Sequence, residues 1–395
     1  MVIYLVLLFL VWFDFFGLSL IPITGDAYIV FLLLYIIYGV FRYRKRPRTV
    51  ILSGKLRLFW FIVVGIILST IPCYLYWGQS FYQSILTYKG QYTWIIIPAL
   101  FVISPQEKEL IKALKILFFL MLVDYLGKFY APQIFLSEND KIHMLKGETD
   151  FTVGGYELMA VLFCYYLQKI RANFDFTSLF YVFLIFAFIF CMQNRSTLFP
   201  CVLFLGITLL SMKSKYRLPI LVVICCFAFY VFTKTAETWI ALIEQTESEA
   251  SNEEYARNMS YAYFLNDYSP NWLCDIFGNG FISANTNSIF ADLLASQITQ
   301  SDVGFIGFWN QFGIIPIISF ILLPVIAFKV RGIPYYLKLV AAFTLICSPT
   351  ISYYGSRYHA IVFVLLYYLL FLHLQRIYNE RGLLGCPAWI KSLIC

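Results

Sequence analysis

Apolar residues form long runs along this chain, and short polar segments separate them. A membrane-spanning helix requires about 17–25 predominantly apolar residues, so the runs predict an all-α polytopic fold of roughly twelve transmembrane helices. The predicted spans lie at about residues 1–21, 26–41, 57–77, 93–104, 114–131, 154–169, 176–193, 197–212, 218–234, 303–328, 338–352 and 358–375. Between the third and fourth spans, residues 79–89 fit an amphipathic helix in the membrane interface.

One long polar segment, residues 234–302, interrupts this pattern after the ninth predicted span. It divides the chain into a first helical part (1–233), a large loop (234–302) and a second helical part (303–395). Glutamates are concentrated at 244–254, a run that fits a solvated helix face. The loop ends in Asp302-Val303-Gly304-Phe305-Ile306-Gly307, where the chain becomes apolar again.

The composition excludes an ordinary soluble domain. Hydrophobic residues make up 61% of the chain and charged residues 13%, whereas soluble domains are about 45–50% apolar and about 25% charged. Basic residues are spread over short loops, which argues against a nucleic-acid partner. The chain has three histidines and no CxxC motif, so we expect no metal site and no cofactor.

The basic residues predict the orientation in the membrane, because loops rich in Lys and Arg stay in the cytoplasm. Of the 29 Lys and Arg residues, 21 fall in loops on one side of the predicted bundle. Both termini would then be cytoplasmic, and the large loop would lie outside. The outer side retains Lys89, Lys128, Lys141, Lys146, Arg195, Lys234, Arg257 and Arg357.

Three of these outer cations are candidates for binding an anion. Arg195 lies in a polar turn between two spans, Arg357 lies between the last two spans, and Arg257 is in the large loop. An arginine fork suits a phosphate or diphosphate because it forms bidentate bonds and stays charged. The alternatives are contact with anionic lipid or pairing with a local carboxylate. Lys89 is either a fourth phosphate contact or an interface anchor.

A carboxylate, Asp302, marks the point where the loop becomes a span. Gly304 and Gly307 leave one helix face bare and allow close packing. Asp302 could act as a base, bind sugar hydroxyls, or cap the helix as its first-turn anion. Further outer-side candidates are the carboxylates Asp292 and Glu157 and the aromatic rings Tyr268, Trp272, Tyr353 and Tyr354, which could stack on sugars.

These features resemble the bacterial O-antigen polymerase (Wzy) family, within the wider O-antigen ligase and polymerase superfamily. The architecture covers the whole chain, and the motif-like part covers about residues 250–313. One resembling feature is the turn that carries Arg195, which is separated from Gly206 by ten residues. The others are Arg257 in a long loop, Pro270 before Gly278-Asn279-Gly280, Asn287-Ser288, and Asp302 to Gly307 leading into a span.

The resemblance implies a metal-independent, GT-C-like glycosyltransferase in the bacterial inner membrane. It would join undecaprenyl-diphosphate-linked repeat units at the periplasmic face, in contact with membrane lipid, a chain-length regulator and a flippase. The leaving diphosphate needs its charge neutralised. The resemblance gives this role to Arg195 and Arg257, with Arg357 and Lys89 as helpers. Asp302 would be a base or hydroxyl binder, and Asn287, Tyr353 and Tyr354 would bind substrate.

Three alternatives stay open at this stage. The first is an O-antigen ligase. Ligases of the superfamily carry a His-Asn pair in the long loop, where this chain has Asn287-Ser288. A histidine base therefore cannot be transferred from that motif, and the identity of the base stays open. A lipid-linked oligosaccharide flippase would show a repeat relating its halves, and charges deep in spans, for which Asp14 and Asp124 are the candidates. A non-catalytic partner in a glycan-assembly complex is the third.

Overall fold

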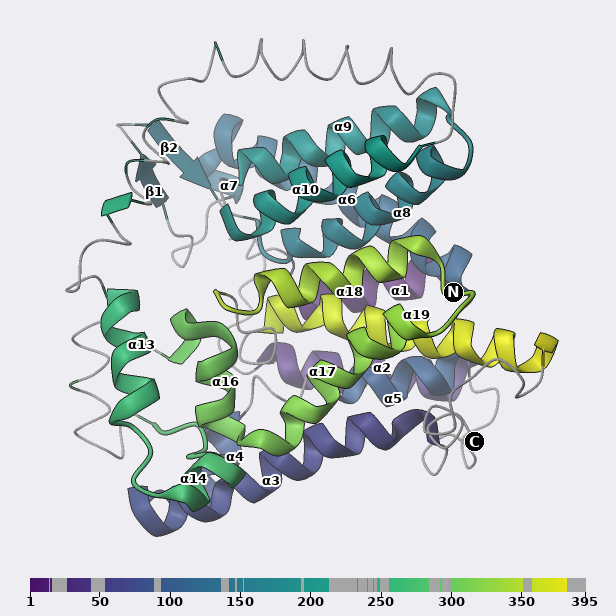
Figure 1. Cartoon of the computed structure of the whole chain (residues 1–395). Helices are drawn as coiled ribbons and strands as arrows, with labels where there is room; N and C mark the ends of the chain where they lie inside the picture. Colours follow the sequence, from purple (N-terminus) through teal and green to yellow (C-terminus); the bar gives the residue numbers. More distant parts are fainter. Residues whose placement is uncertain are drawn as a thin grey trace.

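The computed structural model of the protein is largely helical (Figure 1). It describes residues 1–13, 15, 27–43, 54–88, 94–135, 142–145, 148–151, 153–192, 195–212, 256–283, 300–350 and 357–381, with isolated positions between 233 and 298. The remainder, including the predicted ninth span, lies outside the described residues. The helices α1 (Val2–Trp12), α2 (Ala27–Tyr43) and α3 (Arg57–Trp77) open the chain. The predicted third span has the same bounds as α3.

The long helix α19 (Arg357–Arg381) lies at the centre of the bundle. Its residues from Ala360 to Phe371 are all buried. A helix that is apolar on every side is typically one that is covered on every side. Its neighbours are α5 (Ile96–Ile103), α18 (Tyr335–Cys347) and the short 3-10 helix η4 (Tyr156–Leu158).

Two groups of helices flank this centre. In one, α8 (Met159–Ala172) packs against α9 (Phe176–Cys191), α10 (Arg195–Ser211) and α18, and α6 (Glu107–Tyr130) contacts α8 and α1. In the other, α17 (Ile314–Lys329) packs along α3, and α2 contacts α1 and α5. Figure 1 shows these helices running roughly alongside one another, so that the bundle has two distinct ends.

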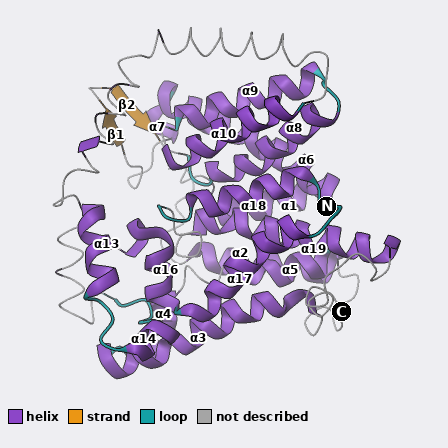
Figure 2. Ribbon diagram, viewed as in Figure 1, coloured by secondary structure: helices purple, strands orange, loops and turns teal. Residues whose placement is uncertain are grey.

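The end drawn at the left of Figure 1 carries most of the described part of the large loop. Here lie α13 (Ala256–Asn266), α14 (Trp272–Phe277), η5 (Gln300–Val303) and α16 (Gly304–Phe312). A short ribbon, β1 (Ile142–Leu145) paired antiparallel with β2 (Glu148–Phe151), lies toward this end after α7 (Pro132–Phe135) (Figure 2). The span pattern did not predict this ribbon, because its strands are too short and polar to form an apolar run.

Local signals explain where several helices begin. The segment predicted as an interfacial helix contains the helix α4 (Phe81–Thr87), and Ser80 caps it through a capping box with Gln83. Gly78, in the left-handed region at φ 67°, ends α3 just before it. At the other end of the bundle, the Asp175 carboxylate accepts a hydrogen bond from the Ser178 N–H, 2.7 Å away, and caps α9.

Two predicted spans need correction. The predicted span 303–328 is divided at Gly313 into α16 and α17. Gly313 has φ 73°, and a Cβ there would lie 2.1 Å from the Ile276 carbonyl oxygen, so α14 can approach only because the residue is glycine. The predicted span 93–104 contains α5, of eight residues. Such a helix is about 12 Å long and cannot cross a hydrocarbon core of about 30 Å.

Among the described residues, two helices are long and apolar enough to cross a membrane: Arg57–Trp77 and His359–Glu380. Shorter apolar helices accompany them, and several expose large apolar side chains such as Phe31, Ile67 and Phe199. Exposed apolar surface on this scale marks an interaction with lipid or protein. The helical fold and this surface are compatible with a transmembrane protein.

Candidate functional site

The turn Cys347–Thr350, at the end of α18, is the point where segments of α10, α13 and α16 meet. The Cys347 Sγ–H donates to the Ser196 carbonyl oxygen at 3.0 Å, at the start of α10. The Phe305 N–H donates to the Ser348 carbonyl oxygen at 2.8 Å, at the start of α16. The Tyr261 hydroxyl of α13 donates to the Pro349 carbonyl oxygen. We call this turn, the starts of α10 and α16, and the part of α13 up to Tyr261 the junction.

The junction gathers three of the segments that carry the predicted chemistry. Arg195 is the first residue of α10, Arg257 is the second residue of α13, and Asp302 lies in η5, the short helix that precedes α16. Arg357 is the first residue of α19, which follows the turn in sequence. The side chains of Arg195, Arg357 and Asp302 lie outside the described residues, so their backbone positions are what the structure provides. The other predicted site residues, Lys89, Asn287, Tyr353 and Tyr354, lie wholly outside them.

Arg257 is the predicted cation whose side chain the structure describes. It is half-buried, and its Nε is a buried donor that has no hydrogen-bond partner among the described residues. Burial raises the pKa of Tyr261, one turn further along α13, and the Arg257 charge opposes part of that rise. A buried guanidinium donor without a partner is costly, and a phosphate oxygen is a suitable acceptor for it.

Close packing at the start of α16 depends on glycine, as the sequence predicted. A Cβ at Gly304 would lie 2.2 Å from the Ser348 carbonyl oxygen, and one at Gly307 would lie 1.8 Å from the Gln300 carbonyl oxygen. Gly304 also has φ 46°, in the left-handed region. The two glycines therefore allow η5 and α16 to dock against the junction.

The turn Gly278-Asn279-Gly280 fixes the large loop to the bundle. The Asn279 N–H donates to the Asn310 carbonyl oxygen at 2.7 Å, and the Gly280 N–H donates to that of Gln311 at 2.8 Å, at the end of α16. The Asn279 side chain is fully buried and accepts a hydrogen bond from Trp77 Nε1 at 3.0 Å, at the end of α3. The segment that carries Arg257 is thus held between α3 and α16.

One predicted sugar-stacking ring proves to be part of this anchor. Tyr268 is buried, and its ring stacks on Trp77 with centroids 5.2 Å apart and planes 21° apart. Burial raises the pKa of its hydroxyl well above the ordinary value. The hypothesis that Tyr268 stacks on sugar is wrong because Trp77 covers its face. Trp272, by contrast, is exposed.

Sequence reasoning missed an acid–histidine pair beside the junction. His359 Nε2 lies 2.7 Å from Glu157 Oε1, which joins the first turn of α19 to η4. The Glu157 side chain is 4% exposed and that of His359 is 25% exposed. Glu157 Oε2 is buried without a hydrogen-bond partner among the described residues. The neighbouring Tyr156 interacts with Thr197, two residues beyond Arg195. The available signals were the histidine two residues after Arg357 and the outer-side carboxylate.

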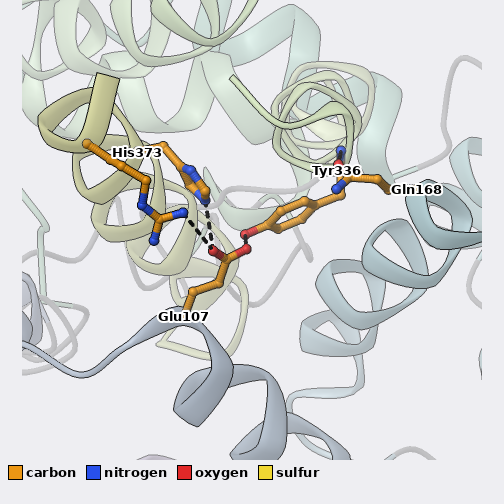
Figure 3. Close-up of polar contacts among 5 residues, drawn as sticks. Glu107, Gln168, Tyr336 and His373 are labelled. Atoms are coloured by element: carbon orange, nitrogen blue, oxygen red, sulfur yellow. Dashed lines mark hydrogen bonds and ion pairs between the residues drawn. The ribbon is translucent and has the colours of Figure 1, made fainter. Parts of the chain in front are cut away.

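A second acid–histidine pair lies at the opposite end of α19 (Figure 3). Glu107, at the start of α6, accepts a hydrogen bond from the Tyr336 hydroxyl at 2.7 Å, and its other oxygen lies 3.0 Å from His373 Nε2. Burial raises the pKa of Glu107, but these contacts and the nearby Arg376 charge outweigh it, and the pKa is lowered overall. The Tyr336 N–H donates to Gln168 Oε1 at 2.8 Å, which adds α8. This cluster joins α6, α8, α18 and α19.

Neither pair resembles a metal centre. Within the part of the chain that the structure describes, no three His, Cys, Asp or Glu side chains gather as metal ligands do.

Comparison with protein-family models, with curated proteins and with solved structures finds no match to this chain. The proposal for function therefore depends on the geometry of the junction.

Proposed function

We propose that this protein is an O-antigen polymerase of the bacterial inner membrane. It joins undecaprenyl-diphosphate-linked oligosaccharide repeat units by glycosyl transfer at the periplasmic face. The observation that carries the proposal is the junction: three segments that each bear, or directly follow, a predicted anion-binding or acidic residue meet at the Cys347–Thr350 turn. In the proposal, the packed helices and the anchored loop hold Arg195, Arg257 and Asp302 at this end of the bundle.

The proposal includes the membrane topology predicted from charge. Apolar side chains on the outer faces of α2, α3, α6 and α10 would contact lipid. The junction end would face the periplasm, because the basic residues at the start of α3 and at the end of α17 belong to the opposite end (Figure 1). A multi-pass chain with both termini in the cytoplasm follows from this orientation.

The proposed chemistry needs neutralisation of a leaving diphosphate. As the new glycosidic bond forms, negative charge develops on the diphosphate oxygen that leaves the anomeric carbon, and fixed cations stabilise such charge. Arg257 supplies a buried Nε donor for this purpose. Arg195, at the helix start on the same junction, and Arg357, at the start of α19, would complete a cationic site, with Lys89 as a helper. Asp302, Asn287, Tyr353 and Tyr354 would contact sugar.

The first test compares surface lipopolysaccharide from cells with and without the protein. Core carrying a single repeat unit, with the long ladder lost, is the expected result. Bare core with polymer accumulating outside on the lipid carrier would indicate a ligase instead. Bare core with single units trapped in the cytoplasm would indicate a flippase and would overturn the proposal.

The second test is specific to the site. Arg257→Ala should shorten the ladder to single units, with a loss of elongation of at least about 100-fold, as for removal of one fixed donor to a developing charge. Arg331→Ala is the matched control, because Arg331 is an exposed arginine in the turn between α17 and α18. Both variants should reach the membrane in wild-type amounts. A normal ladder in Arg257→Ala would exclude its role.

A further inference from the structure

We propose that Lys115 and Lys169 bind the phosphate headgroup of an anionic phospholipid at the end of the bundle away from the junction. The inference goes beyond the proposed function, because it needs a lipid bilayer around the bundle and no particular reaction. It is carried by two ammonium groups that converge on one pair of stacked tyrosine rings, and by the apolar side chains exposed next to them.

The stacked rings belong to Tyr166 of α8 and Tyr181 of α9. Their centroids are 4.6 Å apart and their planes differ by 5°. The Lys115 Nζ of α6 lies 5.3 Å from the Tyr166 centroid and 5.4 Å from that of Tyr181. An ammonium group equally far from two stacked rings lies beside the stack, so this nitrogen is placed where α6 packs against α8.

A second ammonium group approaches the same stack from α8. The Lys169 Nζ lies 6.0 Å from the Tyr166 centroid and 5.3 Å from that of Tyr165. These distances are within about 6 Å, the range in which an aromatic ring attracts a cation. Lys169 is exposed and Lys115 is half-buried, so both side chains reach the surface of the bundle.

The two ammonium charges are only partly balanced by the protein. They lie close enough to repel each other, and neither is ion-paired with a carboxylate in the part of the chain that the structure describes. The nearby carboxylate is Asp175, which caps α9: hydrogen bonding to Ser178 lowers its pKa, and the Lys169 charge lowers it further. One carboxylate beside two ammonium groups leaves a net positive charge, which favours the binding of a further anion.

The surface beside the cations is apolar, which favours a lipid over a free phosphate ion. Phe119 follows Lys115 by one turn of α6, and its exposed ring meets that of Tyr181 at a centroid distance of 6.4 Å. Phe180 of α9 is also exposed and meets the same ring at 6.1 Å. One turn beyond Phe119, Val123 is exposed as well. Cations followed along a helix by exposed apolar side chains match the order of phosphate and acyl chains in a phospholipid.

The position in the bundle is the level at which headgroups are expected. Lys115 is in the third turn of α6, Lys169 is in the last turn of α8, and Tyr181 is in the second turn of α9. The start of α6 also carries Glu107, at the end away from the junction (Figure 3). Tyrosine is enriched at membrane interfaces, and basic pockets between transmembrane helices on the cytoplasmic side bind phospholipid headgroups. In the proposed topology this end faces the cytoplasm.

The test titrates the full-length protein, purified in detergent and stripped of lipid, with dioleoylphosphatidylglycerol, and measures bound lipid by native mass spectrometry. Lys115→Gln/Lys169→Gln should bind this lipid about 30-fold more weakly, because each basic side chain near an anionic lipid contributes about fivefold. Lys169→Gln alone, at an exposed position, should weaken binding about fivefold. Lys115→Arg/Lys169→Arg should retain binding, because it keeps both charges.

The matched control is Lys329→Gln/Arg331→Gln. It also removes two positive charges from the end away from the junction, at exposed residues in the last turn of α17 and just after it. Neither residue lies over an aromatic ring in the described part of the chain. The control should bind the lipid as the wild type does. Equal weakening in the two double Gln variants would overturn the proposal, because total charge and not the site would then explain binding.

Two further ligands separate the headgroup from other sources of binding. Dioleoylphosphatidylcholine, which has no net charge, should bind the wild type and Lys115→Gln/Lys169→Gln alike. Inorganic phosphate should not displace dioleoylphosphatidylglycerol at equal concentration. Displacement by phosphate would assign the site to a free anion, and equal wild-type affinity for the two lipids would show that charge plays no part. Either result would overturn the proposal.

Discussion

Glu107 provides the sharpest test of how the bundle is held at the end away from the junction (Figure 3). In Glu107→Gln, the side chain keeps one oxygen acceptor and replaces the other with an amide donor, so the charged acceptor of the Tyr336 hydroxyl and the ionic contact with His373 are lost. Charge-assisted hydrogen bonds contribute about 1.5–3 kcal/mol each. The contact with Arg376 is 3.9 Å long and half-exposed, so it adds little. We expect a local destabilisation of about 2–3 kcal/mol.

Hydrogen exchange of the protein in nanodiscs measures this cost locally. The amides around Tyr336 should exchange about 30- to 150-fold faster in Glu107→Gln, because 1.36 kcal/mol corresponds to a factor of ten. The control is Glu380→Gln. Glu380 is an exposed carboxylate near the end of α19, the helix that carries His373, and its substitution should leave exchange unchanged. Equal protection of Tyr336 in Glu107→Gln and the wild type would refute the reasoning.

The contribution of Glu107 to stability should depend on pH in one direction only. The pKa of Glu107 is lowered in the folded protein from 4.5, so folding favours its charged form. The contribution of Glu107 to stability is complete at a pH above its ordinary pKa. It is lost as the pH falls through the lower pKa of the folded protein. The difference between wild type and Glu107→Gln should therefore be full at pH 7 and should disappear in strong acid. A difference that grows on acidification would contradict this account.

Two further predictions concern the anchoring of the large loop. Gly313→Ala should destabilise the α14–α16 contact by at least about 2 kcal/mol in a thermal unfolding assay, because the left-handed backbone and the Ile276 carbonyl both oppose a side chain. The control is Gly206→Ala, where a Cβ meets open space, and it should be neutral or slightly stabilising in that assay. Asn279→Ala should leave the Trp77 indole N–H without its acceptor and speed hydrogen exchange in α14 at least about tenfold, and unchanged exchange there would contradict the role of the turn.

The junction shows how far the predicted site could be reached from sequence. The residues Arg257 and Asp302 were predicted separately, from polar turns in an apolar chain, and the structure places their segments on one turn of backbone. That meeting was not in the pattern, because the acceptors that join the two segments are the backbone carbonyl groups of Ser348 and Pro349, which every sequence carries. Tyr268 illustrates the opposite error, since a tyrosine in a polar loop gives no sign that a tryptophan will cover it.

Sequence by itself determined the helical character of the chain, the bounds of α3, the short helix α4 and the glycines at the start of α16. These are local properties, because an apolar run, a serine cap or a glycine pair acts within a few turns of backbone. Only the tertiary structure decided that Gly313 divides a predicted span, and that Glu157 meets His359 at 2.7 Å. Both depend on segments remote in sequence, whose approach is fixed by packing against α19 and α14 and not by any periodicity in the residues themselves.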